Sequence, residues 1–316
     1  MASQAAASLE ANSRAQRYRR VEQALWDHYG LAATEHFVQL DQPPVRLRVV
    51  EIGSGDPVMF VHGTPGMGPY WGPLLQCLPG FRALLLDRPG WGLSEPLDYS
   101  RHRYPSVTAD VMRGVMDGLG LRRAAVVGHS IGNVWALRIA LAEPQRITAV
   151  GLMGGGPIVD EIAPPSFIRL LASPIGAIIT RLPQSRGLIE KMLRESGHGP
   201  SLEAGRVPDA FFEWRTALSR HTASMRHERD MVKVLLGRNG WRPGLTFSAD
   251  ELASVQQPVA WALGSADVVG SVELWTRAAR QMAQAELRVI EGTGHLPWLD
   301  APDQVAGELR RAFSHG

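Results

Sequence analysis

The chain has 316 residues, of which 45% are hydrophobic and 20% charged, and its formal net charge is +2. This composition is typical of a globular protein with one or two domains, and no run of like charge suggests nucleic-acid binding. Because Cys77 is the single cysteine, no disulfide can form within the chain. We expect a soluble, cytoplasmic protein with a small-molecule substrate. The sequence leaves its oligomeric state open, a homo-oligomer included.

The amino-terminal segment is rich in Ala and Ser and has no continuous apolar core, so the sequence does not predict a signal peptide. No apolar run reaches the length of a membrane span. We expect residues 1–13 to be disordered. A helical pattern then runs from Arg14 to Tyr29 and stops at Gly30, a residue suited to a helix C-terminus.

Eight short segments have the apolar or alternating pattern of strands. They are residues 35–40, 45–51, 58–61, 83–87, 124–127, 149–153, 259–263 and 286–290. Helical patterns follow several of these segments, over 105–119, after Ser130, over 272–284 and over 302–313. Apolar strands that alternate with helices predict an α/β fold, with a mostly parallel sheet and helices on both of its faces.

The alternation stops between residues 158 and 250, where only helical patterns are found. The segment 166–182 is apolar and interrupted at Pro174, and the segments 188–195 and 209–236 are amphipathic. Open α/β sheets bind ligands at the carboxyl ends of their strands, so an insertion there would cover the site. We therefore expect a core of residues 1–156 and 251–316, with a helical cap or lid over 157–250.

The sequence Gly128-His129-Ser130-Ile131-Gly132 stands between a buried strand and a helix. A sharp turn between strand and helix holds a serine in a strained conformation and exposes its hydroxyl. The free N–H groups at the start of the helix favour a nearby oxyanion, which attack on a carbonyl generates. Ser130 is therefore the candidate nucleophile.

A serine nucleophile needs a base, and the base needs an orienting acid. His295 follows the last strand in a Gly-rich loop, and Asp267 follows the strand before it. The chain order Ser130, Asp267, His295 is the order expected of this architecture. Asp160 and Asp300 are alternative candidates for the acid.

Two backbone donors are expected to form the oxyanion hole, the N–H groups of Ile131 and Thr64. Pro65 has no N–H and cannot serve. His62, His129, Trp71 and Trp298 are candidate substrate-binding residues, although each could equally pack in the core or brace a loop. The histidines lack metal-ligand spacing and the Gly-rich turns match no nucleotide-binding motif, so we expect neither a metal nor another cofactor.

These motifs resemble the α/β-hydrolase superfamily from about residue 35 to 314. The shared motifs are His62-Gly63-Thr64-Pro65-Gly66, Asp87-Arg88-Pro89-Gly90-Trp91-Gly92-Leu93-Ser94, Gly128 to Gly132, Gly264 to Asp267 and Gly294-His295. The resemblance implies the α/β-hydrolase fold, with an eight-stranded, mostly parallel sheet and an inserted helical cap.

Within the superfamily, the loop at His62 and the helical lid look like those of epoxide hydrolases and haloalkane dehalogenases. Those enzymes use an Asp nucleophile, whereas this chain has Ser130. The serine is similar to that of esterases, lactonases, carbon–carbon bond hydrolases, cofactor-free haloperoxidases and proline iminopeptidase-like peptidases. Thr64 replaces a glycine of the peptidase pattern, which argues against a peptidase.

We expect a serine hydrolase of carboxylesterase type that cleaves a small-to-medium apolar ester or related acyl compound. The apolar lid segment 167–182 motivates the apolar substrate. One alternative is a carbon–carbon bond hydrolase, or a proline iminopeptidase-like peptidase, with the same Ser-His-Asp triad. Because fold does not fix function, a non-hydrolytic small-molecule receptor and an acyltransferase or biosynthetic tailoring enzyme are further alternatives.

Overall fold

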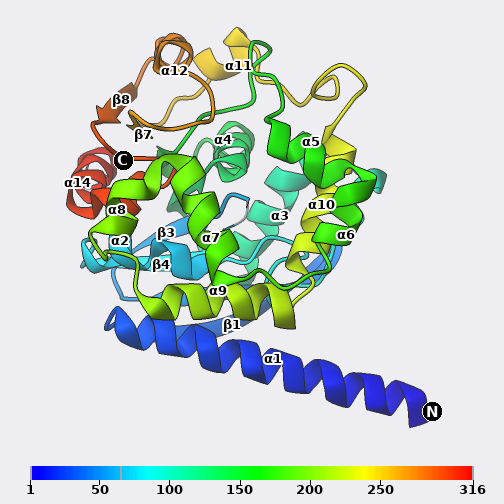
Figure 1. The fold of residues 1–316 in the computed structure, drawn as a ribbon. Coiled ribbons are helices and arrows are strands. Elements are labelled where there is room, and N and C mark those ends of the chain that lie inside the picture. Colours follow the sequence, from blue (N-terminus) through cyan, green and yellow to red (C-terminus); the bar gives the residue numbers. More distant parts are fainter. Residues whose placement is uncertain (1, 65, 315–316) are drawn as a thin grey trace.

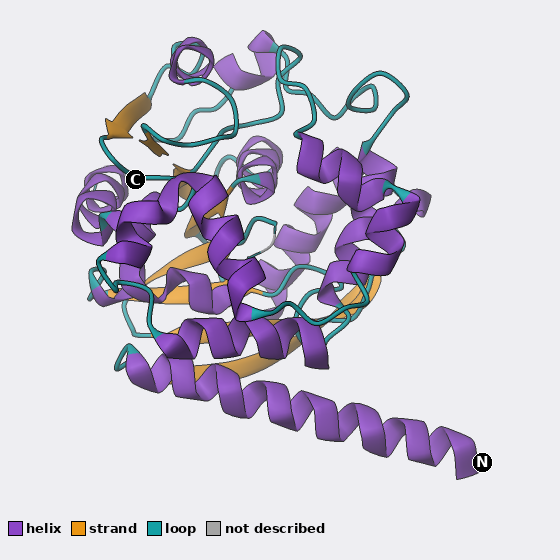
Figure 2. Cartoon of the chain, in the orientation of Figure 1, coloured by secondary structure: helices purple, strands orange, loops and turns teal. Residues whose placement is uncertain are grey.

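A twisted sheet runs through the centre of the molecule, and helices cover both of its faces (Figures 1 and 2). The structure, a computed structural model, describes residues 2–64 and 66–314, and the side chains of all of these except residues 2–12. None of the described helices is both long and apolar enough to cross a membrane.

Within the described residues, eight strands form one sheet in the order β1-β2-β4-β3-β5-β6-β7-β8. Their bounds are β1 Ala33–Asp41, β2 Pro44–Ile52, β3 Asp56–Val61, β4 Phe81–Leu86, β5 Ala124–His129, β6 Ile147–Met153, β7 Val259–Gly264 and β8 Ala285–Ile290. The pairs β1–β2 and β2–β4 are antiparallel, and the remaining pairs are parallel. The predicted fold class is confirmed.

Apolar side chains of the parallel strands alternate between two cores, because successive residues of a strand point to opposite faces. On β5, Ala124 and Val126 belong to one core, and Ala125 and Val127 to the other. Residues of α3, α4, α11 and α12 complete the first core. Residues of α1, α2, α13 and α14 pack in the second. These helices are α2 Gly72–Gln76, α3 Tyr104–Gly118, α4 Ile131–Ala142, α11 Ala249–Ala253, α12 Val272–Ala279, α13 Pro297–Asp300 and α14 Pro302–Phe313.

Between β6 and α11, the described chain forms helices and connecting loops. The helices are α5 Ser166–Ala172, α6 Pro174–Ile179, α7 Arg186–Leu193, a π-helical turn Arg194–His198, α8 Gly199–Glu203, α9 Asp209–His221 and α10 Ser224–Leu235. The pattern over 209–236 is divided into two helices. The break lies at Thr222, whose hydroxyl contacts both the carbonyl of Leu218 and the hydroxyl of Ser224, and such local bonds compete with a continuous helix.

The amino-terminal helix differs from the expectation. Helix α1 spans Ala2–His28, whereas the sequence predicted disorder over residues 1–13 and a helix from Arg14 only. Alanine has the highest helix propensity, and the alanine-rich start of the chain extends the helix. Further along, α1 packs against α9 (Figure 1).

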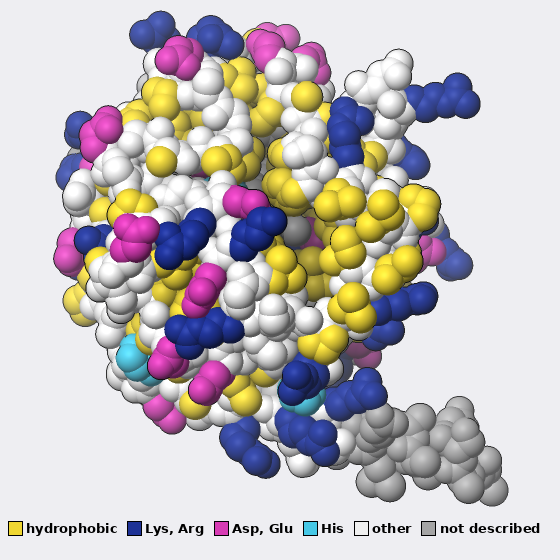
Figure 3. Space-filling view, viewed as in Figure 1, with side chains coloured by type: hydrophobic (Ala, Val, Ile, Leu, Met, Phe, Trp, Pro, Cys, Tyr) yellow, Lys and Arg dark blue, Asp and Glu magenta, His cyan; other side chains and the backbone are white. Residues whose placement is uncertain are grey.

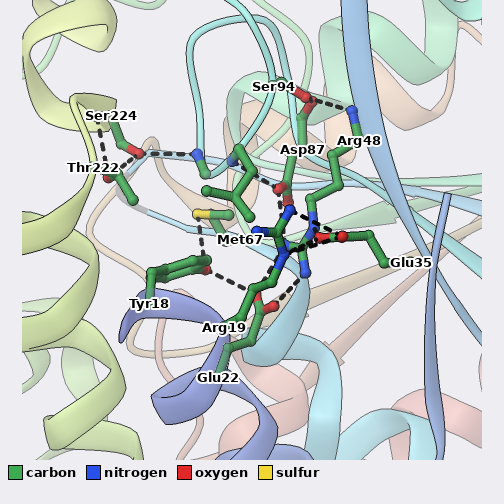
Figure 4. A network of polar contacts seen from close by, with 12 residues as sticks. Tyr18, Arg19, Glu22, Glu35, Arg48, Met67, Asp87, Ser94, Thr222 and Ser224 are labelled. Carbon is green, nitrogen blue, oxygen red and sulfur yellow. Dashed lines mark hydrogen bonds and ion pairs between the residues drawn. The ribbon is translucent and has the colours of Figure 1, made fainter. Parts of the chain in front are cut away.

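A buried polar network joins α1 to the sheet and to the cap (Figure 4). The guanidinium of Arg48 on β2 donates to the carboxylates of Glu22 on α1 and Asp87 after β4. The Tyr18 hydroxyl donates to Glu22 at 2.8 Å and accepts from the Trp214 indole N–H on α9 at 3.2 Å. Helix α1 therefore connects the core to one helix of the cap.

Candidate active site

Ser130 stands at the turn between β5 and α4, so the predicted strand, turn and helix are present. Among the described residues, Ser130 is the only non-glycine with positive φ, with φ 54° and ψ −119°. This strained conformation is typical of a nucleophile elbow. The Ser130 N–H donates to the carbonyl of Met153 at 3.0 Å, and its carbonyl accepts from the N–H of Asn133 at 2.9 Å. Both backbone polar groups of Ser130 are therefore hydrogen-bonded, one to β6 and one to α4.

Two glycines allow strand and helix to cross at this turn. A Cβ atom on Gly132 would lie 2.1 Å from the carbonyl oxygen of Val61, and one on Gly128 would lie 2.4 Å from that of Gly132. No side chain fits at such distances, because Cβ contacts under 3.0 Å essentially never occur. The close crossing that places Ser130 therefore requires glycine at both positions.

His295 and Asp267 meet on the loops that follow β8 and β7. The Nδ1 atom of His295 lies 2.8 Å from Oδ1 of Asp267. The Asp267 carboxylate also accepts from the N–H groups of Gly155 at 2.7 Å and Val269 at 2.8 Å. Burial acts to raise the pKa of Asp267, but the contacts with His295 and the two N–H groups hold it below its usual value. A carboxylate stabilised in this way can orient the imidazole and stabilise its cation.

The loop that begins at His62 passes directly beside Ser130. A Cβ atom on Gly63 would lie 2.8 Å from Cβ of Ser130. The imidazole of His62 is buried and braces this loop, because Nδ1 contacts the carbonyl of Gly63 at 2.9 Å and Nε2 accepts from the N–H of Arg88 at 3.2 Å. Burial, followed by the charge of Arg88, lowers the pKa of His62 well below its usual value.

Arg88 and Glu228 form a buried ion pair between the core and the cap. Arg88 Nη2 lies 3.1 Å from Glu228 Oε2 and also donates to the carbonyl of Gly63 at 3.2 Å. The hydroxyl of Thr64 and the indole N–H of Trp91 donate to the same carboxylate. Burial raises the pKa of Glu228 despite the presence of Arg88. The pair ties helix α10 to the loop of Thr64.

An apolar cavity of about 60 Å³ lies in front of Ser130, between core and cap. Thr64 and Ile131, the two expected oxyanion donors, line it together with Ser130. Most of the other lining side chains are apolar residues of the cap, such as Phe167 and Met231. The one charged residue among the described lining residues is Glu228, which Arg88 already pairs.

A second cavity of about 50 Å³ is lined by Thr64, His129, His295 and, from the cap, Arg215. Arg215 is 1% exposed and stands on α9. Its Nη2 donates to the side-chain oxygen of Gln184 at 2.8 Å. Its Nε and Nη1 are buried and have no hydrogen-bond partner among the described residues. The first cavity is apolar, whereas this one holds a buried cation.

Beneath His295, a second histidine–carboxylate pair holds the loop. His198, on the π-helical turn of the cap, has Nδ1 2.8 Å from Oδ2 of Asp300, and its Nε2 accepts from the N–H of Leu296 at 3.1 Å. Asp300 Oδ2 also accepts from the N–H of Gly294 at 2.8 Å. Both neighbours of His295 in the chain are therefore fixed by this pair. Asp300, a candidate for the acid, contacts His198, whereas His295 contacts Asp267.

Of the four candidate substrate-binding residues, one lines a cavity of the site and three do not. His129 lines the second cavity, and its Nε2 contacts the carbonyl of His295 at 3.1 Å. His62, Trp71 and Trp298 are not among the residues that line either cavity. Trp71 and Trp298 are buried and stack with their ring centroids 4.2 Å apart. Packing in the core, the alternative to substrate binding, accounts for the contacts of these two tryptophans.

Sequence reasoning missed Arg215, His198 and Glu228. Arg215 stands in an amphipathic helix, where an arginine is ordinarily expected on the solvated face, and no motif marks it. The partners of the other two residues are about 100 or more positions away in the chain, so no local pattern reveals them. Within the part of the chain that the structure describes, no cluster of His, Cys, Asp or Glu could hold a metal ion.

The fold and the serine turn define an α/β hydrolase. The sequence profile of the α/β hydrolase family matches residues 58–308, which is most of the chain. The chain therefore belongs to this family.

Curated relatives include hydrolases of 2-hydroxy-6-oxononadienedioate and 2-hydroxy-6-oxononatrienedioate. The relative from Cupriavidus pinatubonensis is 33% identical over 153 residues, which are 44% of this chain and 52% of that protein. The chain spans about half the length of the first curated relatives that it matches. A relative from Burkholderia vietnamiensis with the same name is 27% identical over 84% of this chain and 90% of its own length.

Solved structures show the same fold at low identity. Naproxen esterase from Bacillus subtilis superposes with a TM-score of 0.73 and 17% identity, over 94% of this chain and 97% of that one. The 2-hydroxy-6-oxo-6-phenylhexa-2,4-dienoate hydrolase of Rhodococcus sp. strain RHA1 gives 0.72 and 20%, over 90% of this chain and 99% of that one. An esterase and a dienoate hydrolase therefore both share this fold.

Proposed function

We propose that this chain hydrolyses a carbon–carbon bond next to a ketone in a substrate that carries a carboxylate. The observation that carries the proposal is Arg215, a buried guanidinium that lines a cavity with His295 and has two nitrogens without a hydrogen-bond partner among the described residues. An unpaired buried charge is costly, and a carboxylate fits the geometry of a guanidinium. The names of the curated relatives describe substrates with two carboxylates and a 6-oxo group. These observations favour the carbon–carbon bond hydrolase, the alternative given in the sequence analysis, over a hydrolase of apolar esters.

In the proposed reaction, the hydroxyl oxygen of Ser130 forms a bond to the ketone carbon, and its proton moves to His295. Asp267 accepts a hydrogen bond from the other ring nitrogen and stabilises the imidazolium. The ketone oxygen becomes an oxyanion, which the N–H groups of Thr64 and Ile131 stabilise. Attack at this position is supported by the strained turn of Ser130 and by the loop of Gly63 beside it.

The tetrahedral intermediate then collapses and the carbon–carbon bond breaks. The bonding electron pair passes into the conjugated fragment that carries the carboxylate, and His295 returns its proton to that fragment. Arg215 holds this carboxylate and favours the negative charge that develops next to it. Water, deprotonated by His295, then attacks the acyl group on Ser130. The bond between the serine oxygen and the acyl carbon breaks, the product leaves as a carboxylic acid, and His295 returns the proton to the Ser130 oxygen. The helices over 157–250 act as a cap that excludes bulk water during these steps.

A second candidate function is the hydrolysis of an apolar ester. It is favoured by the apolar cavity in front of Ser130, because Glu228, the one charged residue among its described lining residues, is already paired with Arg88. The same nucleophile, base and acid would serve, with an alcohol as leaving group. The two functions differ in whether Arg215 matters to the reaction.

The proposal is tested by replacing Arg215 and comparing two substrates. Arg215→Gln and Arg215→Lys are assayed with a 2-hydroxy-6-oxo-dienoate and with neutral p-nitrophenyl butyrate. Loss of a charge-assisted hydrogen bond worth about 1.5–3 kcal/mol lowers kcat/KM roughly tenfold to a hundredfold. We expect this loss for the carboxylate substrate alone, smaller for Lys than for Gln. The matched control is Arg220→Gln, an exposed arginine of the same helix.

Equal effects on both substrates, or no dienoate turnover by the wild type, would contradict a carboxylate-specific hydrolase. Intact mass after fluorophosphonate treatment tests the nucleophile separately. One adduct on the wild type that is absent from Ser130→Ala supports a reactive serine. Tight binding of the dienoate without turnover would instead indicate a receptor. Product formation only in the presence of an added acyl acceptor would indicate an acyltransferase.

A further inference from the structure

Exposed apolar side chains gather on one side of the cap. Seven of the eight large apolar side chains that are exposed in the described part of the chain lie between residues 167 and 188. We call six of them the cap patch: Phe167, Leu170, Ile175, Ile178, Ile179 and Leu182, each 43–64% exposed. The seventh, Leu188, stands on α7. Figure 3 shows hydrophobic side chains gathered over α5 and α6. Because soluble monomers rarely expose a contiguous patch of this kind, it marks an interaction surface.

The charges around the cap patch are basic. No Asp or Glu occurs between Glu161 and Glu190 in the sequence, whereas Arg169 and Arg181 are exposed within that range. Arg186 is paired with carboxylates of Glu190 and Asp209.

The neighbouring helix continues this pattern. Helix α10, which packs against α5 and α6, adds exposed Arg226 and Lys233, with Asp230 as its exposed acid. The charge around the patch therefore complements an anionic surface.

The cap patch reaches the cavity of Ser130. Phe167 is 43% exposed on the patch and also lines that cavity. Ile168, its buried neighbour on α5, lines the cavity from the same helix. A surface that docks on the patch therefore lies next to the apolar route to the serine.

We propose that the cap patch docks on the surface of an anionic lipid bilayer. Short helices with Phe, Leu and Ile on one face and Arg at the rim bind at the boundary between headgroups and acyl chains, and basic residues add attraction to anionic lipids. A second copy of the chain fits less well. Two-fold pairing through the patch would bring two sets of Arg169 and Arg181 together, with no acidic residue in the segment to pair them. This inference does not depend on which bond the enzyme cleaves.

The test measures binding to vesicles by flotation. The 316-residue chain is mixed with vesicles that contain either phosphatidylcholine alone or phosphatidylcholine with about one fifth phosphatidylglycerol. The variants are the triple substitution Ile175→Ser, Ile178→Ser, Leu182→Ser and the double substitution Arg169→Gln, Arg181→Gln. Val268→Ser is the matched control, since Val268 is the eighth exposed apolar residue, lies outside the patch and is 59% exposed. Circular dichroism and thermal melting check that each variant folds.

We expect the wild type and Val268→Ser to float with the anionic vesicles. The apolar triple variant should lose at least tenfold in partitioning. The arginine variant should bind anionic and neutral vesicles equally weakly, and added salt should weaken wild-type binding. Absence of wild-type flotation would overturn the proposal, as would equal flotation of the triple variant. A dimer in light scattering that the triple variant disperses, without any vesicle binding, would assign the patch to a second copy instead.

Discussion

His198 and Asp300 form a histidine–carboxylate pair that contacts the loop of His295 on both sides of that residue. The pair fixes the N–H groups of Gly294 and Leu296, and the N–H of His295 itself donates to the carbonyl of Ser196 on the cap at 2.9 Å. The position of the candidate base is therefore determined by the cap as well as by the core.

Replacing His198 with Gln should reduce turnover with little effect on substrate affinity. A glutamine amide lacks the fixed geometry of the two imidazole nitrogens, so it does not serve Leu296 N–H and Asp300 together as His198 does. A displaced base costs roughly tenfold to a hundredfold in kcat. Steady-state kinetics on p-nitrophenyl butyrate, together with the rate of fluorophosphonate labelling, measure the effect. His221→Gln, at the end of α9, is the control, and an unchanged kcat would remove His198 from the positioning of His295.

Replacing Glu228 with Ala should destabilise the protein strongly. The substitution leaves the guanidinium of Arg88 buried without its carboxylate partner, which typically costs about 3–5 kcal/mol. Glu228→Gln keeps an acceptor for Arg88 and Trp91, and should cost less. Urea unfolding of both variants measures the difference. Glu213→Ala, an exposed position on α9, should be close to neutral, and similar losses in all three variants would refute a special role for the pair.

Replacing Gly132 with Ala should distort the serine turn. The added Cβ would lie 2.1 Å from the carbonyl oxygen of Val61, so the backbone of β3 or α4 must shift. We expect a loss of about 1–3 kcal/mol in stability, together with loss of fluorophosphonate labelling. Gly307→Ala is the matched control, because its Cβ would meet no atom within 4 Å and a helical alanine stabilises by roughly 0.5–1 kcal/mol. Normal labelling of the Gly132 variant would contradict this geometry.

Stability should decrease as the pH falls below about 6.5, the ordinary histidine pKa. Burial lowers the pKa of both His62 and His129, so each stays neutral in the folded protein and takes up a proton on unfolding. The unfolded state then binds more protons, and each histidine removes up to about 1.4 kcal/mol per pH unit. Asp87 acts in the opposite direction, because burial raises its pKa to about 7 and its proton is released on unfolding.

The effect is therefore measured as a difference between variants. Urea unfolding of the wild type and His62→Asn is compared from pH 7 to pH 5. The variant should lose less stability over this range, because it lacks the proton that His62 takes up on unfolding. The slope of the unfolding free energy against pH should therefore differ by up to about 1.4 kcal/mol per pH unit. Parallel curves would show that His62 is protonated in the folded protein or does not contribute.

The fold could be predicted from the sequence because its signals are local. The continuous apolar runs at Val58 and Ala83 and the glycines around Ser130 each specify one element within a few residues. The place of Asp267 and His295 directly after strands predicted that they would meet, since the carboxyl ends of parallel strands lie at one edge of the sheet. Their 2.8 Å contact is present.

The remaining features depend on contacts between distant segments. Whether Arg215 faces solvent or a cavity is decided by how α9 packs on α1 and the core, which its own helical pattern does not specify. Trp71 and Trp298 are far apart in the sequence, and their stacking arises only when α13 packs against α2. The direction in which a side chain of the cap faces, and the stacking of rings from distant segments of the core, therefore cannot be predicted from the sequence alone.

The attachment of α1 to both core and cap has a consequence for how substrate enters. Tyr18 contacts Trp214 of α9, while Glu22 of the same helix contacts Arg48 of the sheet. A rotation of the whole cap away from the sheet would have to break at least one of these two contacts. Substrate entry that keeps both contacts therefore leaves α9 in place against α1, and α1 in place against the sheet.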